Sequence, residues 1–122
     1  MYLDSLGNVI PGLSRSGHLA VGVPGSVDGM FEVHKKHGQL KDFKQLIQPA
    51  IDLAANGFLL TPLEIERLNR FKESFQKHNK SANAFVKDTP WIEGDRLVQK
   101  ELAHTLSLIR DKGRAGFYEG ET

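Results

Sequence analysis

The sequence predicts a mainly α-helical fold preceded by one or two short N-terminal strands. Apolar residues recur at three- and four-residue intervals in several segments after residue 24, which is the helical period. Residues 1–23 are instead rich in glycine and contain short β-branched runs. Since two short strands alone make a marginal sheet, we expect a single partial domain over residues 1–122. Its strand and loop region covers residues 1–23, and its helical region covers residues 24–122.

The composition is that of a globular domain. The 122 residues are 39% hydrophobic and 25% charged, which is enough to bury a core. A formal net charge of +1 gives no general attraction to nucleic acid or to an anionic membrane. The absence of cysteine excludes disulfides, thiolate metal sites and cysteine nucleophiles. No apolar stretch reaches membrane-spanning length, and the first residues lack the pattern of a signal peptide.

Two N-terminal segments have strand character. Residues 1–3 (MYL) precede a turn at Gly7 and Asn8, and residues 18–23 (HLAVGV) are the longer candidate. We expect both to contribute to a sheet larger than the pair itself.

The first helix is expected to begin near Pro24 or Ser26 and to end at Gly38. The Ser26 side chain could cap the free amides of its first turn, and glycine is a common stop signal. Its largely apolar face consists of Val27, Met30, Phe31 and His34.

A second helix is expected from about Lys41 to Asn56, followed by Gly57. Its apolar stripe consists of Phe43, Leu46, Ile47, Ala50, Ile51 and Ala54. Pro49 lies inside this pattern. Because proline lacks an amide hydrogen and crowds the preceding turn, we expect a kink or a break just before it.

The clearest start signal is TPLEIERLNRF, residues 61–71. Thr61 can cap, Pro62 suits the first helical position and Glu64 completes a capping box. The apolar residues Leu63, Leu68, Phe71 and Phe75 then point roughly one way. Residues 76–85 (QKHNKSANAF) are polar and predict a loop with at most one helical turn.

The last long helix is expected to be capped by Asp95 and to end at Gly113. Its apolar positions are Leu97, Val98, Leu102, Leu106 and Ile109. The residues after Gly113 (RAGFYEG) predict a short turn or helical piece.

The glycine-rich turn before the first helix has the order of many phosphate-binding loops. It lacks the lysine and Ser/Thr pair of a Walker-type loop and the spacing of a dinucleotide fingerprint. Free helix amides could still attract an anion. We favour a structural interpretation of Gly22, Gly25 and Gly29, which would permit a tight turn and close packing of helix against strand.

Histidines supply two further candidates for chemistry. His34 and His37 lie three residues apart on a helix and could share a metal ion, but no third ligand is placed on their face, so we favour helix-terminal histidines near a favourable dipole. Ser14, Ser16 and His18 combine hydroxyl and imidazole groups, but nothing in the sequence positions a third group beside them.

Two basic clusters and two aromatic residues complete the candidates. The clusters are mixed with acidic residues and predict solvated helix faces rather than nucleic-acid contacts. They are Lys35, Lys36, Lys41 and Lys44, and then Arg67, Arg70 and Lys72. Trp91 and Tyr118 are expected to be buried anchors of loops, with stacking on a ligand as the alternative.

Three stretches occur in an order that resembles the γ-glutamyltranspeptidase family, also called glutathione hydrolases. They are HLAVGVPGSVDGMFEVHKKHG (18–38), LIQPAIDLAANGF (46–58) and GDRLVQKELAHTLSLIRDKGRAGFYEG (94–120). His37 stands where the family often has tyrosine, and Lys100 and Glu119 occupy variable positions. The resemblance covers nearly the whole chain.

The resemblance implies an internal segment of the large subunit of a longer, self-cleaving precursor. The new N-terminal threonine of the small subunit would be the nucleophile, and would transfer γ-glutamyl groups of glutathione through an acyl-enzyme. That threonine and the glycine-rich oxyanion segment are not in these residues, and the arginine that binds the γ-glutamyl carboxylate would lie upstream of Met1. We therefore expect no catalytic, cofactor-binding or metal-binding residue in this chain, and no cofactor.

The resemblance also implies a setting for the chain. The family fold is the αββα sandwich of the N-terminal nucleophile hydrolases. The partners would be the remainder of the large subunit and the small subunit, in a periplasmic or extracellular location. We expect the isolated segment to be inactive and to self-associate through exposed apolar faces. Two alternatives remain: a segment of a related cephalosporin acylase or capsule depolymerase, and a self-standing helical interaction module.

Overall fold

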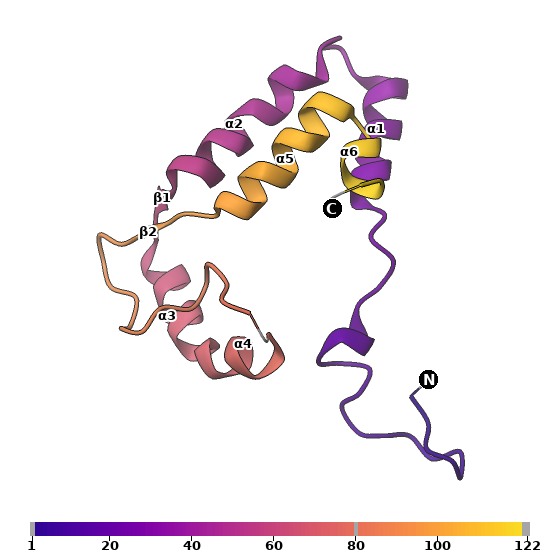
Figure 1. The fold of residues 1–122 in the computed structure, drawn as a ribbon, viewed down its shortest axis with the longest axis vertical. Coiled ribbons are helices and arrows are strands. Elements are labelled where there is room, and N and C mark those ends of the chain that lie inside the picture. The colour runs from indigo at the N-terminus through magenta and orange to yellow at the C-terminus, as the bar shows by residue number, and fades with distance from the viewer. Residues whose placement is uncertain (1, 80, 121–122) are drawn as a thin grey trace.

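A computed structural model describes residues 2–79 and 81–120 of the chain (Figure 1). The helices are α1 (Ser26–His37), α2 (Phe43–Asn56), α3 (Pro62–Arg70), α4 (Lys72–His78), α5 (Lys100–Lys112) and α6 (Ala115–Tyr118). The other elements are a 3-10 helix η1 (His18–Ala20) and the strands β1 (Phe58–Leu59) and β2 (Arg96–Leu97). The expected mainly α-helical character is confirmed.

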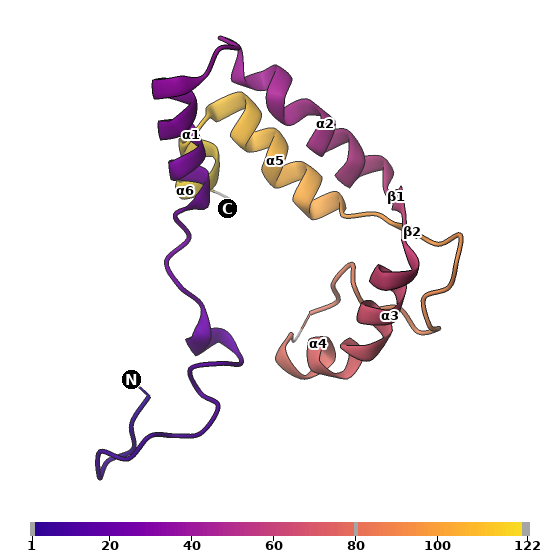
Figure 2. The same ribbon diagram turned by 180° about the vertical axis from the view of Figure 1, so that it is seen from behind.

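The helices α2 and α5 lie side by side and form the centre of the molecule. In both views α1 and α6 lie at one end of this pair, and α3 and α4 lie at the other (Figures 1 and 2). The N-terminal residues extend from α1 as an open chain that comes near α4 at Ser16 and His18. Arg110 on α5 donates to the Oε1 of Gln48 on α2 over 2.8 Å, which adds a polar contact to the packed pair.

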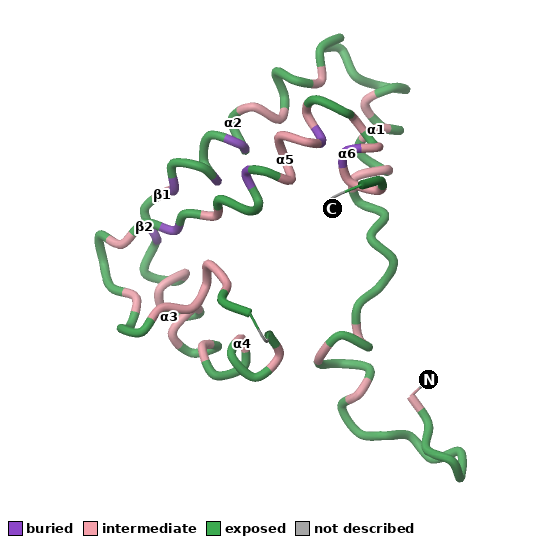
Figure 3. The backbone as a smooth tube through the Cα atoms, in the orientation of Figure 1, coloured by how far each residue is buried: buried purple, intermediate pink, exposed green. Residues whose placement is uncertain are grey.

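The small core follows the α2–α5 pair and the strands beside it (Figure 3). Its buried hydrophobic residues are Ile51, Ala54, Leu60, Leu97, Ala103 and Ile109. Apolar burial is the main force that holds such a pair together, and these buried residues lie between Ile51 and Ile109.

The two strands pair antiparallel, with Phe58 opposite Leu97 and Leu59 opposite Arg96. Gly57, with φ of 75°, ends α2 and turns the chain directly into β1. The guanidinium of Arg96 donates to the carbonyl oxygen of Gly57 over 2.7 Å. The strand pair therefore fixes the start of α5 beside the end of α2.

The expected N-terminal strands are not formed. Met1 lies outside the described residues, Leu3 makes only an isolated bridge with Val9, and residues 18–20 form a 3-10 helix. The backbone of Val21 is extended, with φ of −77° and ψ of 132°, but it joins no strand. A strand is stable when neighbouring strands satisfy its backbone groups, and the described residues provide no sheet there.

The ends of α1 only partly match the prediction. Gly38 follows the last helical residue as expected, and its amide donates to the carbonyl oxygen of His34. Ser26 is the first helical residue, and Gly25 occupies the N-cap position without a side-chain hydrogen bond. The expected serine cap was therefore wrong by one residue.

Of the kink or break expected just before Pro49, the break was wrong, because α2 continues through the proline. Asp42 caps the helix by accepting the Lys44 amide over 3.0 Å. Proline costs the helix one hydrogen bond, and packing against α5 offsets that loss.

The capping box at Thr61 is confirmed. The Glu64 carboxylate accepts the Thr61 amide over 2.7 Å, and the Glu64 amide donates to the Thr61 hydroxyl over 3.4 Å. The helical region that follows is divided in two at Phe71, where φ is −95° and ψ is 6°. The side chains of Leu63 and Phe75 therefore lie on separate helices.

Asp95 does not cap the last long helix. Its carboxylate accepts the Ile92 amide over 2.8 Å and pairs with the Lys87 ammonium. Hydrogen bonds from these two groups lower the pKa of Asp95, with the Lys87 side chain as the larger cause. β2 follows directly, so α5 begins only at Lys100, whereas its end at Gly113 is confirmed.

Candidate functional site

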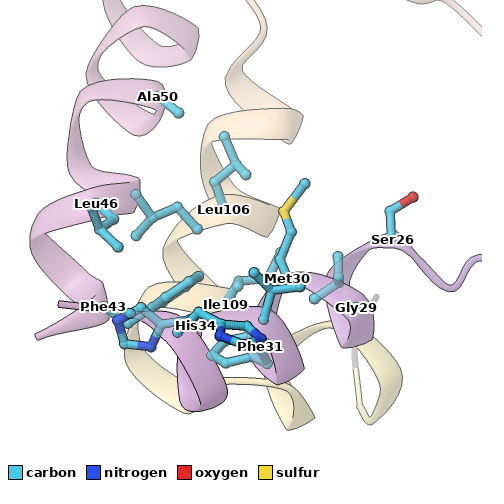
Figure 4. A pocket seen from close by; sticks show the side chains of 15 residues that line it. Ser26, Gly29, Met30, Phe31, His34, Phe43, Leu46, Ala50, Leu106 and Ile109 are labelled. Atoms are coloured by element: carbon cyan, nitrogen blue, oxygen red, sulfur yellow. The ribbon is translucent and has the colours of Figure 1, made fainter. Parts of the chain in front are cut away.

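An apolar groove lies where α1 meets the α2–α5 pair (Figure 4). Its volume is about 880 Å³. The lining residues include Val27, Met30, Phe31 and Val33 from α1, Phe43, Leu46, Ile47 and Ala50 from α2, and Leu106 and Ile109 from α5. Phe31 and Phe43 close one side, with ring centroids 4.4 Å apart.

The groove contains few groups for polar chemistry. Ser26, His34 and His37 are its only lining residues with a polar side chain, and no Asp, Glu, Lys or Arg is among them. Ligand sites usually add a few convergent polar groups to an apolar lining. Here the three polar residues all come from α1, and the lining residues from α2 and α5 are all apolar. The groove is therefore suited to an apolar occupant.

The His34 side chain has a structural role. Its Nε2 lies 2.7 Å from the carbonyl oxygen of Leu40, and its ring meets the edge of Phe43 with centroids 5.3 Å apart. It therefore holds the turn between α1 and α2. Among the described residues, no group of three or more His, Cys, Asp or Glu could hold a metal ion, and His37 brings no further ligand to His34.

Backbone groups at the glycine turn before α1 are already bonded to the Tyr118 side chain of the same chain. The Asp28 amide, in the first turn of α1, donates to the Tyr118 hydroxyl over 3.2 Å. That hydroxyl donates to the carbonyl oxygen of Pro24 over 2.6 Å. The Asp28 carboxylate adds negative charge at the same end of the helix and pairs with Arg114. An anion at this helix terminus would meet that carboxylate, which opposes phosphate binding.

The packing role expected of the three glycines is not seen within the described chain. A Cβ placed on Gly22, Gly25 or Gly29 would have no atom within 4 Å, and none of the three has a positive φ. The close helix-to-strand packing was predicted from a sheet that these residues do not form. These glycines instead leave the backbone of the junction open.

Tyr118 is an anchor, as predicted. Its hydroxyl joins α6 to both Pro24 and Asp28, and its half-buried ring is covered by the Arg114 guanidinium, which lies 4.6 Å from the ring centroid. The hydrogen bond to the Asp28 side chain raises the pKa of Arg114. The end of the described chain thereby holds the beginning of α1.

Trp91 is an anchor too, though half-buried. Its amide donates to the Asn69 Oδ1 over 2.8 Å, and the Asn69 amide group donates back to the Trp91 carbonyl oxygen over 2.9 Å. The indole Nε1 donates to the carbonyl oxygen of Phe85 over 3.0 Å. These bonds tie the loop before β2 to α3.

The remaining candidates do not form a catalytic arrangement. Ser16 and His18 share a shallow hollow with Ser74 and His78 of α4, and no carboxylate is among its lining residues. Ser14 is not in that lining. A nucleophile–base pair needs a third group to orient the base, and the residues around this hollow supply none.

Most residues of the basic clusters lie on solvated helix faces, as predicted. Lys41 lies between α1 and α2 instead, and the half-buried Lys72 donates to the Asp88 carbonyl oxygen over 2.9 Å. Lys36 pairs with Glu32 over 3.3 Å, and Arg70 pairs with Glu66 over 3.4 Å, with every side chain more than half exposed. Exposed pairs of this kind contribute little to stability. None of the described helices has the length and hydropathy needed to cross a membrane.

The groove was missed by sequence reasoning. The apolar stripe of α1 indicated a buried face, but the stripe alone does not reveal that Met30 and Val33 remain 62% and 61% exposed. That fact depends on how far α1 stands from α2 and α5, which only the tertiary arrangement gives.

Comparison with known proteins identifies the family. The family model for γ-glutamyltranspeptidase matches residues 1–122. The glutathione hydrolase proenzyme of Pseudomonas sp. strain A14 is 49% identical over an alignment of 123 positions, which covers 99% of this chain and 21% of that protein. The chain therefore spans about a fifth of the length of such curated relatives.

Solved structures agree with this assignment. Helicobacter pylori γ-glutamyltranspeptidase superposes with a TM-score of 0.91 and 46% identity, over 99% of this chain and 35% of that chain. The Bacillus anthracis transpeptidase CapD gives a TM-score of 0.73 and 35% identity, over 93% and 36% of the two chains. The match over the whole chain, in both sequence and structure, places this chain in the γ-glutamyltranspeptidase family.

Proposed function

We propose that residues 1–122 are a large-subunit segment of a γ-glutamyltransferase or glutathione hydrolase. The complete enzyme transfers a γ-glutamyl group from a donor such as glutathione to water or an amino acid. The observation that carries this proposal is the likeness to H. pylori γ-glutamyltranspeptidase, at 46% identity and a TM-score of 0.91 over 99% of the chain. At that similarity, we expect these helices to form the same part of the enzyme scaffold in both proteins.

The lengths of the relatives support a divided precursor. The segment is 21% of a relative named as a proenzyme but 35% of the H. pylori chain whose structure was solved. A solved chain shorter than the proenzyme is expected if the precursor is cut and this segment remains in the larger piece. In this proposal the partners of the segment are the rest of the large subunit and the small subunit, in an αββα sandwich outside the cytoplasm.

The segment contributes scaffold, and the reacting groups come from elsewhere in the enzyme. A threonine at the new N-terminus of the small subunit attacks the γ-glutamyl carbonyl, with its own amine as base, and the acyl-enzyme is then resolved by water or an amino acid. The groove between α1, α2 and α5 carries no charged lining residue that could bind the charged γ-glutamyl donor. In this proposal the groove is therefore a surface for packing against other protein, and it does not bind the substrate.

A turnover assay tests the proposal. The 122-residue chain and the full-length protein that contains it are each supplied with γ-glutamyl p-nitroanilide, and release of p-nitroaniline is followed by absorbance. We expect turnover by the full-length protein and none by the 122 residues. Turnover by the 122 residues would contradict the assignment of catalysis to other parts, and an inactive full-length protein would contradict the activity.

Capsule chemistry is the second candidate, because CapD of B. anthracis shares the fold at 35% identity. The 49% identity to the glutathione hydrolase proenzyme of Pseudomonas sp. strain A14 and the 46% identity to H. pylori γ-glutamyltranspeptidase favour the first candidate. Supplying the full-length protein with poly-γ-glutamate in place of glutathione distinguishes the two.

A further inference from the structure

We propose that the groove between α1, α2 and α5 is an internal packing surface, filled by an apolar, uncharged face of the remainder of the same γ-glutamyltranspeptidase chain. This inference rests on the proposed function, because it requires the longer parent chain. It goes further in assigning one surface of the segment to that contact and in stating the chemistry of the occupant.

The character of the lining selects the occupant. Val33 and Met30 on α1 are 61% and 62% exposed, and Leu46 on α2 is 52% exposed. All three line the groove, which has no Asp, Glu, Lys or Arg in its lining. Apolar patches of this kind on a protein surface mark contacts with other protein. A charged segment in the groove would lose its hydration without gaining a partner.

The comparison with a solved chain favours an occupant from the same polypeptide. The arrangement of the described helices is kept at a TM-score of 0.91 in a chain of which the matched residues are only 35%. The groove is therefore a feature of a molecule that has much more polypeptide available to cover it. A second copy of this segment is not needed to fill it.

Gly29 provides an independent indication. It lies inside α1 and lines the groove, and a Cβ there would have no atom within 4 Å. Glycine inside a helix weakens the helix relative to alanine, and nothing in the described chain requires it. An occupant that approaches the α1 backbone closely at this point accounts for its presence.

Cysteine accessibility in the full-length protein tests the proposal. The 122 residues contain no cysteine, so a single cysteine placed here is a specific label once any cysteine elsewhere is replaced by serine. Val33→Cys reports on the groove. Lys35→Cys is the matched control, because it lies two residues along the same helix, is exposed and does not line the groove. Each variant is treated with a maleimide in the native state and again in denaturant.

We expect Val33→Cys to react at least about tenfold more slowly in the native protein than in denaturant, and Lys35→Cys to react at similar rates in both. Equal native reactivity at the two positions would overturn the proposal. So would protection of Val33→Cys that disappears on dilution, since that would indicate a second copy as occupant.

A second pair of variants covers the case in which Val33→Cys does not fold. Leu46→Cys probes the groove from α2, and Lys44→Cys is its exposed control on the same helix. The readout does not depend on turnover. An inactive full-length protein with a protected groove would therefore reject the proposed function alone, and an active protein with an accessible groove would reject this inference alone.

Discussion

The packed half of the molecule (residues 43–118) and the open half (residues 2–37) differ in how closely four of their glycines are surrounded. A Cβ on Gly116 would lie 2.1 Å from the carbonyl oxygen of Leu108, and one on Gly57 would lie 2.7 Å from the Cγ2 of Val98. A Cβ on Gly22 or Gly25 would meet nothing within 4 Å. Among the described residues, none before Ile51 is buried.

The packed half buries apolar side chains in a core of its own, whereas the open half leaves most of its apolar side chains on the surface. The α2–α5 pair, the β1–β2 ladder and α6 bury side chains against one another. The N-terminal segment and α1 are attached to that unit by a few contacts, notably the Tyr118 hydroxyl and the Phe31–Phe43 ring pair. The open half is where we propose that the remainder of the parent chain packs.

The largest expected effect breaks the packed half. Ile109 is only 4% exposed and lies on the α5 face that meets α2. We expect Ile109→Ala to lower the free energy of unfolding by about 3 kcal/mol, through lost burial and the cavity left behind. Urea denaturation measures it. Leu102→Ala, on the same helix but 41% exposed, should cost clearly less; equal losses would contradict the location of the core.

Gly116→Ala tests the contact between α6 and α5. The added methyl group cannot fit 2.1 Å from a carbonyl oxygen, so α6 must shift. We expect a loss of about 2 kcal/mol, typical of overpacking, together with weaker protection of the α6 amides in hydrogen exchange. Gly22→Ala is the control from the open half. If it were as costly as Gly116→Ala, the contrast between the two halves would fail.

Tyr118→Phe tests the link between the halves. It removes the hydroxyl that bonds the Pro24 carbonyl oxygen and the Asp28 amide. We expect a loss of about 1 kcal/mol in unfolding free energy. The Asp28 amide should also exchange faster, while amides in the middle of α5 keep their protection relative to global unfolding. An unchanged Asp28 amide would show that the α1 junction is held by other contacts.

The smallest expected effect is the pH dependence of the α3 capping box. Hydrogen bonds from the Thr61 amide, and then from its hydroxyl, lower the pKa of Glu64 below its usual 4.5. Because the pKa is lower in the folded state, the stabilisation is fully present above pH 4.5 and is lost as the pH falls through the lowered value. NMR titration of the Glu64 carboxyl group measures the shift.

Thr61→Ala removes the hydroxyl and provides the control. The pKa of Glu64 should move back toward 4.5 in that variant, but not completely, since the backbone amide remains. A Glu64 pKa that is the same in both proteins would contradict the reciprocal bonding.

Local signals made much of the helical architecture predictable. The Thr61–Glu64 capping box and the stops at Gly57 and Gly113 act within a few residues, so they can be recognised along the chain. The β1–β2 pair could not be predicted, because each strand has two residues and its partner is far away in sequence. Asp95 has the residue type of a helix cap, but its actual partners, Ile92 and Lys87, precede it in the folded loop.

The site was less predictable than the fold. Tyr118 and Trp91 could be recognised as anchors by residue type, but their partners at Pro24 and Asn69 come from other elements. The groove depends on the spacing of three helices, which no single stretch encodes. The strands expected before Pro24 were predicted from β-branched residues, and no neighbouring sheet exists in the described chain to pair with them.

Hydrogen exchange across the whole segment tests the contrast between the halves most directly. Amide exchange is compared between the 122-residue chain and the same residues within the full-length protein. We predict that amides in residues 21–37 exchange at least about tenfold more slowly in the full-length protein, whereas those in the middle of α2 and α5 are protected in both. Unchanged exchange at residues 21–37, or loss of protection in α2 and α5 of the 122-residue chain, would contradict the account.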